Sequence, residues 1–86
     1  MIKYENTFLD GHRTEKDITL NGEVVGLLTT EKSFTGYQQR FKGSLVVRSY
    51  TLSLYGHSDI TFNVSNYASA RQALSACKRY VKEALT

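Results

Sequence analysis

The sequence predicts an α+β fold, an antiparallel meander of four to five strands with one C-terminal helix packed on one face of the sheet. A helical apolar stripe runs through residues 66–85, and alternating apolar patterns fill most of the chain before it. The connections between these patterns are short and rich in turn residues, which excludes parallel crossovers. A chain of 86 residues supports one small core, so we expect residues 1–86 to form a single domain.

The first hairpin is the best-marked part of the predicted sheet. Residues 14–20 and 23–30 alternate apolar and polar side chains, and Asn21 and Gly22 lie between them. Asn-Gly is typical of a two-residue type I′ turn, because both central residues of that turn have positive φ. Pairing across this turn places four apolar residues on one face: Ile18, which lies opposite Val25, together with Leu20 and Leu27.

The segments on either side of this hairpin are marked more weakly. Residues 2–4 allow a short edge strand, which ends before a turn at residues 10–12. Residues 33–36 are expected to form a second turn or loop, and residues 37–42 alternate well enough to predict a strand.

A long strand is predicted for residues 45–55, which are β-branched and aromatic. The apolar side of this segment changes partway along, so we expect a bulge near Arg48 and Ser49. A turn at residues 56–59 leads to a last strand, in which Ile60, Phe62 and Val64 face the core.

The C-terminal helix is predicted from apolar residues spaced three and four apart. They are Tyr67, Ala70, Leu74, Cys77, Val81 and Ala84. Ser65 or Asn66 is expected to accept hydrogen bonds from the first free backbone N–H groups of the helix. Cys77 lies on the buried stripe, so we interpret it as a small core residue rather than a nucleophile.

Composition bounds the class of protein. Hydrophobic residues make up 41% of the chain and charged residues 22%, as in ordinary globular domains. One cysteine cannot form an internal disulfide, which favours a reducing compartment, and we expect a cytoplasmic protein. The N-terminus lacks the apolar run of a signal peptide, and no segment approaches the length needed to cross a membrane.

Catalytic and metal motifs have little support in the sequence. His12 and His57 are not at metal-ligand spacing with each other or with Cys77. The run from His57 to Asp59 contains the residue types of a triad, but three consecutive turn residues cannot align a nucleophile with its base. The glycines occur singly, so no phosphate-binding loop is present. We therefore expect no enzyme, no metal and no cofactor.

The distribution of charge gives a first candidate surface. Net charge is +3, and residues 67–85 carry all of it, while residues 1–66 sum to zero. Cations late in a helix complement its dipole, and this explanation competes with a basic docking face. The helix candidates are Arg71, Lys78, Arg79 and Lys82.

A second candidate surface lies on the predicted sheet, where basic residues alternate with aromatic ones. Such a mixture is typical of nucleic-acid platforms and of protein hot spots, and equally of ordinary cross-strand packing. The sheet candidates are Arg40, Lys42, Arg48 and Tyr50. We expect the sheet set to bind tightly and the helix set to steer association electrostatically.

Two resemblances extend this interpretation. Three strands followed by a helix over residues 37–85, with Ser69-Ala70-Arg71-Gln72-Ala73 opening the helix, resemble the arm-type DNA-binding domain of phage tyrosine recombinases. That family inserts its sheet into the major groove, but this chain has an extra hairpin upstream and few cations on the sheet. The size of the chain and its lack of catalytic motifs resemble the small inhibitors encoded by bacteriophages, anti-CRISPR and anti-restriction proteins among them.

The expected function is therefore that of a non-enzymatic binding protein. We expect a small phage or mobile-element inhibitor that acts in a bacterial host cell. It would occlude a protein or nucleoprotein partner such as a host defence complex. The alternative is a nucleic-acid-binding module that uses the basic, aromatic face of the sheet. We expect no membrane partner, and the sheet face that the helix leaves uncovered allows a homodimer.

Overall fold

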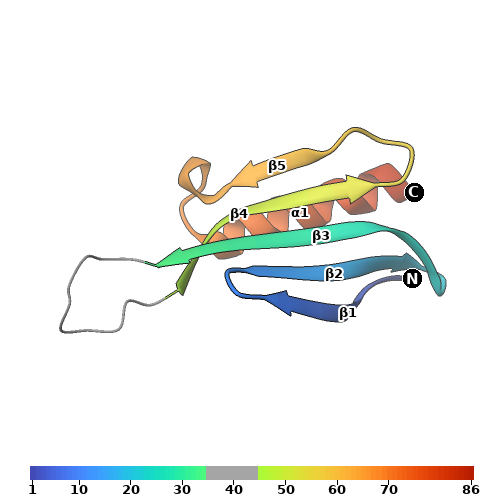
Figure 1. Cartoon of the computed structure of the whole chain (residues 1–86). Coiled ribbons are helices and arrows are strands. Elements are labelled where there is room, and N and C mark those ends of the chain that lie inside the picture. Colours follow the sequence, from blue (N-terminus) through green and yellow to red (C-terminus); the bar gives the residue numbers. More distant parts are fainter. Residues whose placement is uncertain (35–44) are drawn as a thin grey trace.

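The computed structural model describes residues 1–34 and 45–86. The strands are β1 (Ile2–Asp10), β2 (Arg13–Leu20), β3 (Glu23–Phe34), β4 (Leu45–Leu54) and β5 (Ile60–Asn63). A 3₁₀ turn, η1 (Val64–Asn66), leads to the helix α1 (Ala70–Leu85). The strands form one antiparallel sheet in the order β1-β2-β3-β4-β5, and α1 packs against it (Figure 1). The predicted α+β meander with one C-terminal helix is confirmed.

The hairpin between β2 and β3 has the predicted two-residue turn. Leu20 pairs with Glu23, and Asn21 and Gly22 have φ values of 51° and 89°. Both central residues therefore occupy the left-handed region that a type I′ turn requires.

The register of this hairpin differs from the prediction. Ile18 pairs with Gly26 rather than Val25, because a bulge shifts the register between Ile18 and Thr19. Leu27 therefore pairs with Asp17 and lies on the face opposite Ile18, so the prediction that Leu27 shares the face of Ile18 was wrong. Leu28 takes its place in the core, and Val25 still packs against the core from within the bulge.

The predicted bulge in β4 is confirmed. Glu31 pairs with Ser49 and Lys32 with Val47, which leaves Arg48 as the extra residue. The bulge returns Tyr50 and Val47 to one side of the sheet, and this explains why the apolar side changes along the sequence.

Two of the expected strands have other bounds. β1 is nine residues long rather than a short edge strand, and its register is interrupted between Glu5 and Phe8, where Asn6 has a φ of 56°. β3 continues through Ser33 and Phe34, where a turn had been predicted. The strand predicted at residues 37–42 lies outside the described residues.

The helix begins later than predicted. Ser69 is its N-cap, and the Ser69 hydroxyl oxygen accepts a hydrogen bond from the backbone N–H of Gln72 at 3.2 Å. Ser65 and Asn66 instead belong to η1, so neither caps the helix as expected. A side-chain acceptor three residues before a free N–H satisfies one of the unpaired donors at the helix start.

The core lies between α1 and the middle of the sheet. α1 rests mainly on β4 and β5 (Figure 1). The buried hydrophobic residues are Ile18, Leu28, Tyr50, Leu52, Leu54, Ala73, Cys77 and Val81. We call the face that carries Ile18 and Leu28 the helix side and the other face the open face. Because α1 is placed over β4 and β5, the helix side of β2 and β3 is covered less completely.

Candidate binding groove

Most of the carboxylates of β1, β2 and β3 lie on the open face of the sheet. Tyr4 pairs with Ile18 on the helix side, so the next pair along, Glu5 with Asp17, lies on the open face. The same alternation places Glu15 and Glu31 on the open face, where they pair with Thr29 and Ser49. Arg13 accompanies them and forms an ion pair with Glu15 at 3.4 Å.

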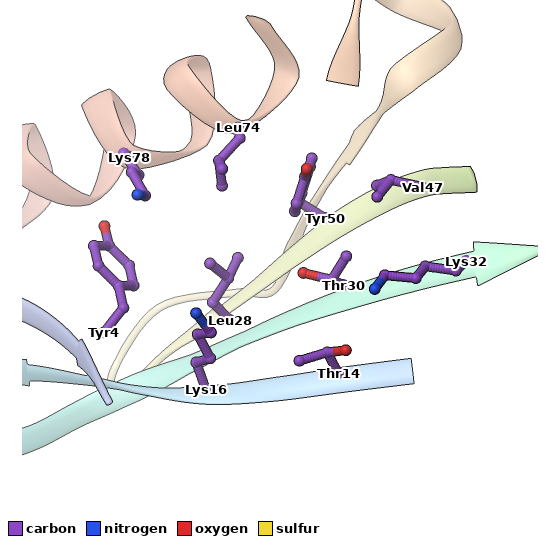
Figure 2. A pocket seen from close by; sticks show the side chains of 10 residues that line it. All are labelled: Tyr4, Thr14, Lys16, Leu28, Thr30, Lys32, Val47, Tyr50, Leu74 and Lys78. Atoms are coloured by element: carbon purple, nitrogen blue, oxygen red, sulfur yellow. The ribbon is translucent and has the colours of Figure 1, made fainter. Parts of the chain in front are cut away.

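The helix side of β2 and β3 carries lysines, and the carboxylate on that side, Glu23, lies beside the hairpin turn opposite Leu20. Lys16 is two residues before Ile18 in β2, and Lys32 is two residues after Thr30 in β3. Lys78 extends from α1 toward them (Figure 2). Strand alternation and helix placement therefore bring three ammonium groups from three elements to one region.

These lysines line a cavity of about 280 Å³ between α1 and the sheet (Figure 2). Its apolar residues are Leu28, Val47 and Leu74, and Thr14 and Thr30, which pair across β2 and β3, supply hydroxyl groups. The full lining is Tyr4, Thr14, Lys16, Leu28, Thr30, Lys32, Val47, Tyr50, Leu74 and Lys78. None of the described residues that line it is acidic.

A second cavity of about 400 Å³ adjoins the first farther along α1. Its lining consists of Met1, Ile2, Tyr4, Leu20, Lys78, Lys82 and Thr86. Tyr4 and Lys78 line both cavities, and the Lys78 ammonium lies 4.9 Å from the centre of the Tyr4 ring, which is a cation–π contact. We call the two cavities together the groove.

The charges of the groove are not neutralised within the described part of the chain. No ion pair there joins Lys16, Lys32, Lys78 or Lys82 to a carboxylate. Desolvation by burial, with a contribution from Cys77, raises the pKa of Tyr4 to about 12, so its hydroxyl stays protonated at neutral pH. The groove therefore presents uncompensated positive charge around an apolar lining.

The helix candidates only partly share this region. Arg71, Lys78, Arg79 and Lys82 are all exposed. Lys78 and Lys82 line the groove, whereas Arg71 and Arg79 line neither of its cavities.

Of the sheet candidates that the structure describes, Arg48 and Tyr50 lie in different surroundings. Arg48 is exposed at the bulge and donates a hydrogen bond from Nε to the hydroxyl oxygen of Ser33. Tyr50 is only 6% exposed and belongs to the core, where it borders the groove. Arg40 and Lys42 lie outside the described residues.

Lys16 and Lys32 were not singled out from the sequence. Each alone resembles a solvated strand residue, and neither strand carries net positive charge, since β2 sums to zero and β3 to −1. The available signal was the phase of β2, in which Thr14 and Lys16 share the face of the buried Ile18. The bulge after Ile18 changes which residues of β3 lie on the helix side, so the same reasoning did not place Lys32 there.

The structure gives no support to a metal or thiol site among residues 1–34 and 45–86. No group of three or more metal-ligating side chains there could hold an ion. Cys77 is fully buried, and burial raises the pKa of its thiol to about 12, as expected for a core residue. No helix in the described part of the chain is long and apolar enough to cross a membrane.

Comparison of the chain with protein-family models, with curated proteins and with solved structures found no match. A functional assignment therefore depends on the chemistry of the groove.

Proposed function

We propose that this chain is a non-enzymatic binding protein that docks its groove onto an acidic protein surface and blocks it. In this respect it would act like the small inhibitors of phages and mobile elements. The observation that carries the proposal is the separation of charge. Lys16, Lys32, Lys78 and Lys82 line one groove without a carboxylate, while Glu5, Glu15, Asp17 and Glu31 lie on the open face.

The composition of the groove favours an acidic protein as partner. Interfaces between proteins combine a buried apolar centre with a polar rim, and the groove offers Leu28, Val47 and Leu74 among its lysines. Complementary charge speeds association and excludes partners of the same sign. Blocking a partner requires only such an interface and no catalytic groups.

Nucleic acid is the second candidate, because unpaired lysines also bind phosphates. Platforms for single strands, however, stack bases on accessible aromatic rings. The two rings of the groove do not offer such a surface, since Tyr50 is buried and Lys78 lies over Tyr4. The form of nucleic-acid binding that fits the groove is therefore a duplex held through its phosphates alone.

The proposal is tested by capture from a nuclease-treated bacterial lysate with the whole chain as bait. The groove variant carries Lys16→Glu, Lys32→Glu and Lys78→Glu. A control variant carries Lys3→Glu, Arg71→Glu and Arg79→Glu, which changes the net charge equally outside the groove. We expect the wild-type and control chains to retain the same protein, the groove variant to lose it, and the purified chain to inhibit the activity of that protein.

Three outcomes of this experiment would count against the proposal. Equal capture by the groove variant would mean that binding occurs elsewhere. A captured protein whose activity is unaffected by the chain would exclude the blocking role. Capture that occurs in a parallel untreated lysate but is lost in the nuclease-treated one would favour the nucleic-acid alternative. In that case, the logarithm of the binding constant for duplex DNA should fall with the logarithm of salt concentration, with a slope of about −0.9 per neutralised phosphate.

A further inference from the structure

We infer that the groove holds an extended acidic peptide segment of the partner. Two apolar side chains of this segment occupy the two cavities, and a carboxylate between them contacts Lys78. This inference rests on the proposed function, because it specifies what part of an acidic protein enters the groove. The shape of the groove, the placement of its lysines and its apolar lining each support it.

The groove is elongated rather than a single pocket, because its two cavities adjoin along α1. One wall is formed by Leu74, Lys78, Lys82 and Thr86, which recur every four residues along α1 and its C-cap. At about 1.5 Å per helical residue, this wall is roughly 18 Å long. An extended chain rises about 3.3 Å per residue, so roughly five residues of a peptide would lie along it.

The two cavities are suited to side chains with apolar bodies. The first offers Leu28, Val47 and Leu74. The second offers Ile2 and Leu20 among its lining residues. The first volume, about 280 Å³, lies just below the range for ligand sites, which is about 300–1,000 Å³, and the second, about 400 Å³, lies near its lower end. Each is therefore better matched to an anchoring side chain than to a large ligand.

The lysines are distributed along the groove rather than gathered at one point. Lys16 and Lys32 belong to the first cavity, Lys82 to the second, and Lys78 to both. Figure 2 shows Lys16, Lys32 and Lys78 entering the first cavity from different elements. Such an arrangement fits several spaced carboxylates better than one doubly charged group, and the hydroxyls of Thr14 and Thr30 can pair with peptide backbone groups.

Short peptides test this inference directly. An array would present seven-residue peptides in which two leucines flank three acidic residues at varied spacing. Matched series would replace the leucines by serine or the acidic residues by asparagine and glutamine. We expect the full chain to bind members of the first series about tenfold more tightly than either matched series. Equal binding by the serine series, or no binding by any acidic–apolar peptide, would overturn the inference.

Two pairs of variants locate the binding site. Thr30→Phe fills the first cavity, whereas Thr29→Phe places the same ring on the open face of the same strand. Lys78→Gln removes the shared charge, and Arg79→Gln removes the neighbouring charge outside the groove. We expect Thr30→Phe and Lys78→Gln to weaken peptide binding about tenfold and each control to leave it within about twofold. Circular dichroism checks the folding of each variant, and Lys78→Gln keeps the test valid if Thr30→Phe unfolds.

The outcomes separate this inference from the proposed function. If the lysate partner is lost by the charge-reversed groove variant but retained by folded Thr30→Phe, docking is electrostatic across the groove mouth and no side chain enters. That result would overturn the peptide inference and leave the proposed function standing. If the charge-reversed variant retains the partner, the proposed function itself fails.

Discussion

Gly26 occupies a crowded backbone position between β2 and β4, and Gly26→Ala should destabilise the fold. It lies opposite Ile18 on one side and Leu54 on the other. A Cβ atom at this position would lie 2.6 Å from the backbone oxygen of Ser53 and 2.9 Å from Cδ2 of Leu54. Ordinary contact begins near 3.4 Å, so the oxygen would have to withdraw by 0.8 Å, the difference between 3.4 and 2.6. A movement of that size opens the hydrogen-bonded ladder between β3 and β4.

The magnitude follows from two opposing effects. Overpacking of this kind costs about 1–3 kcal/mol. Replacing glycine also restricts the unfolded chain, which returns about 0.4–1 kcal/mol. We therefore expect a net loss of roughly 1–2 kcal/mol in the free energy of unfolding.

Urea denaturation followed by circular dichroism measures this loss as a lower midpoint with an unchanged slope. Thr29→Ala is the control, because it lies in the same strand but on the open face, away from the collision. A Gly26→Ala chain as stable as the parent would refute the close approach of β3 and β4 at this point.

Three further predictions concern stability. Gly22→Val should lower the free energy of unfolding by about 1–3 kcal/mol. Backbone strain alone causes this loss, because the φ of Gly22 is +89° and no atom lies within 4 Å of the added Cβ. A melting temperature equal to that of the parent would exclude the turn. Val81→Ala should lower the free energy of unfolding by roughly 1.5–3 kcal/mol, because Val81 is fully buried. Leu74→Ala should cost less, because Leu74 is only partly buried at the groove, and the reverse order in urea unfolding would contradict the placement of α1. Burial raises the pKa of Cys77 from 9.0 and that of Tyr4 from 10.0, both to about 12, so the folded state holds these protons more tightly than the unfolded state. The stability that these two groups contribute should be present below pH 9 and lost between pH 9 and 12, and a free energy of unfolding that stays constant over that alkaline range would contradict the burial.

The fold class was predictable because the local sequence patterns agree with the tertiary packing. The Asn21–Gly22 turn, the bulge at Arg48 and the buried stripe of the helix all follow from local chemistry. The bulge after Ile18 was not predictable, because it adds one residue within an apolar run in which either phase is plausible. That single residue exchanges Leu27 for Leu28 as the core side chain.

The start of the helix was mispredicted for a related reason. Ser65, Asn66 and Ser69 are all good N-caps, and the choice among them depends on where η1 redirects the chain after β5. The apolar residue Tyr67 extended the helical stripe in the sequence, although it precedes the helix in the structure.

The groove was less predictable than the fold. Lys78 and Lys82 were found because the helix concentrates positive charge. Lys16 and Lys32 come from strands that carry no net positive charge, so neither strand is marked as basic in the sequence. Only the pairing of β2 with β3 places these two lysines on the face opposite Glu15, Asp17 and Glu31. Tyr50 was a surface candidate from its strand pattern, but α1 covers that side of β4.

The most direct measurement is lysine footprinting of the unmodified chain. Reductive methylation, followed by mass spectrometry, gives the rate at which each lysine reacts with and without the partner captured from lysate. If the groove is the binding surface, the partner should slow methylation of Lys16, Lys32 and Lys78, while Lys3 on the open face should react at its free rate. Protection of Lys3 with unchanged rates at Lys16, Lys32 and Lys78 would contradict binding through the groove.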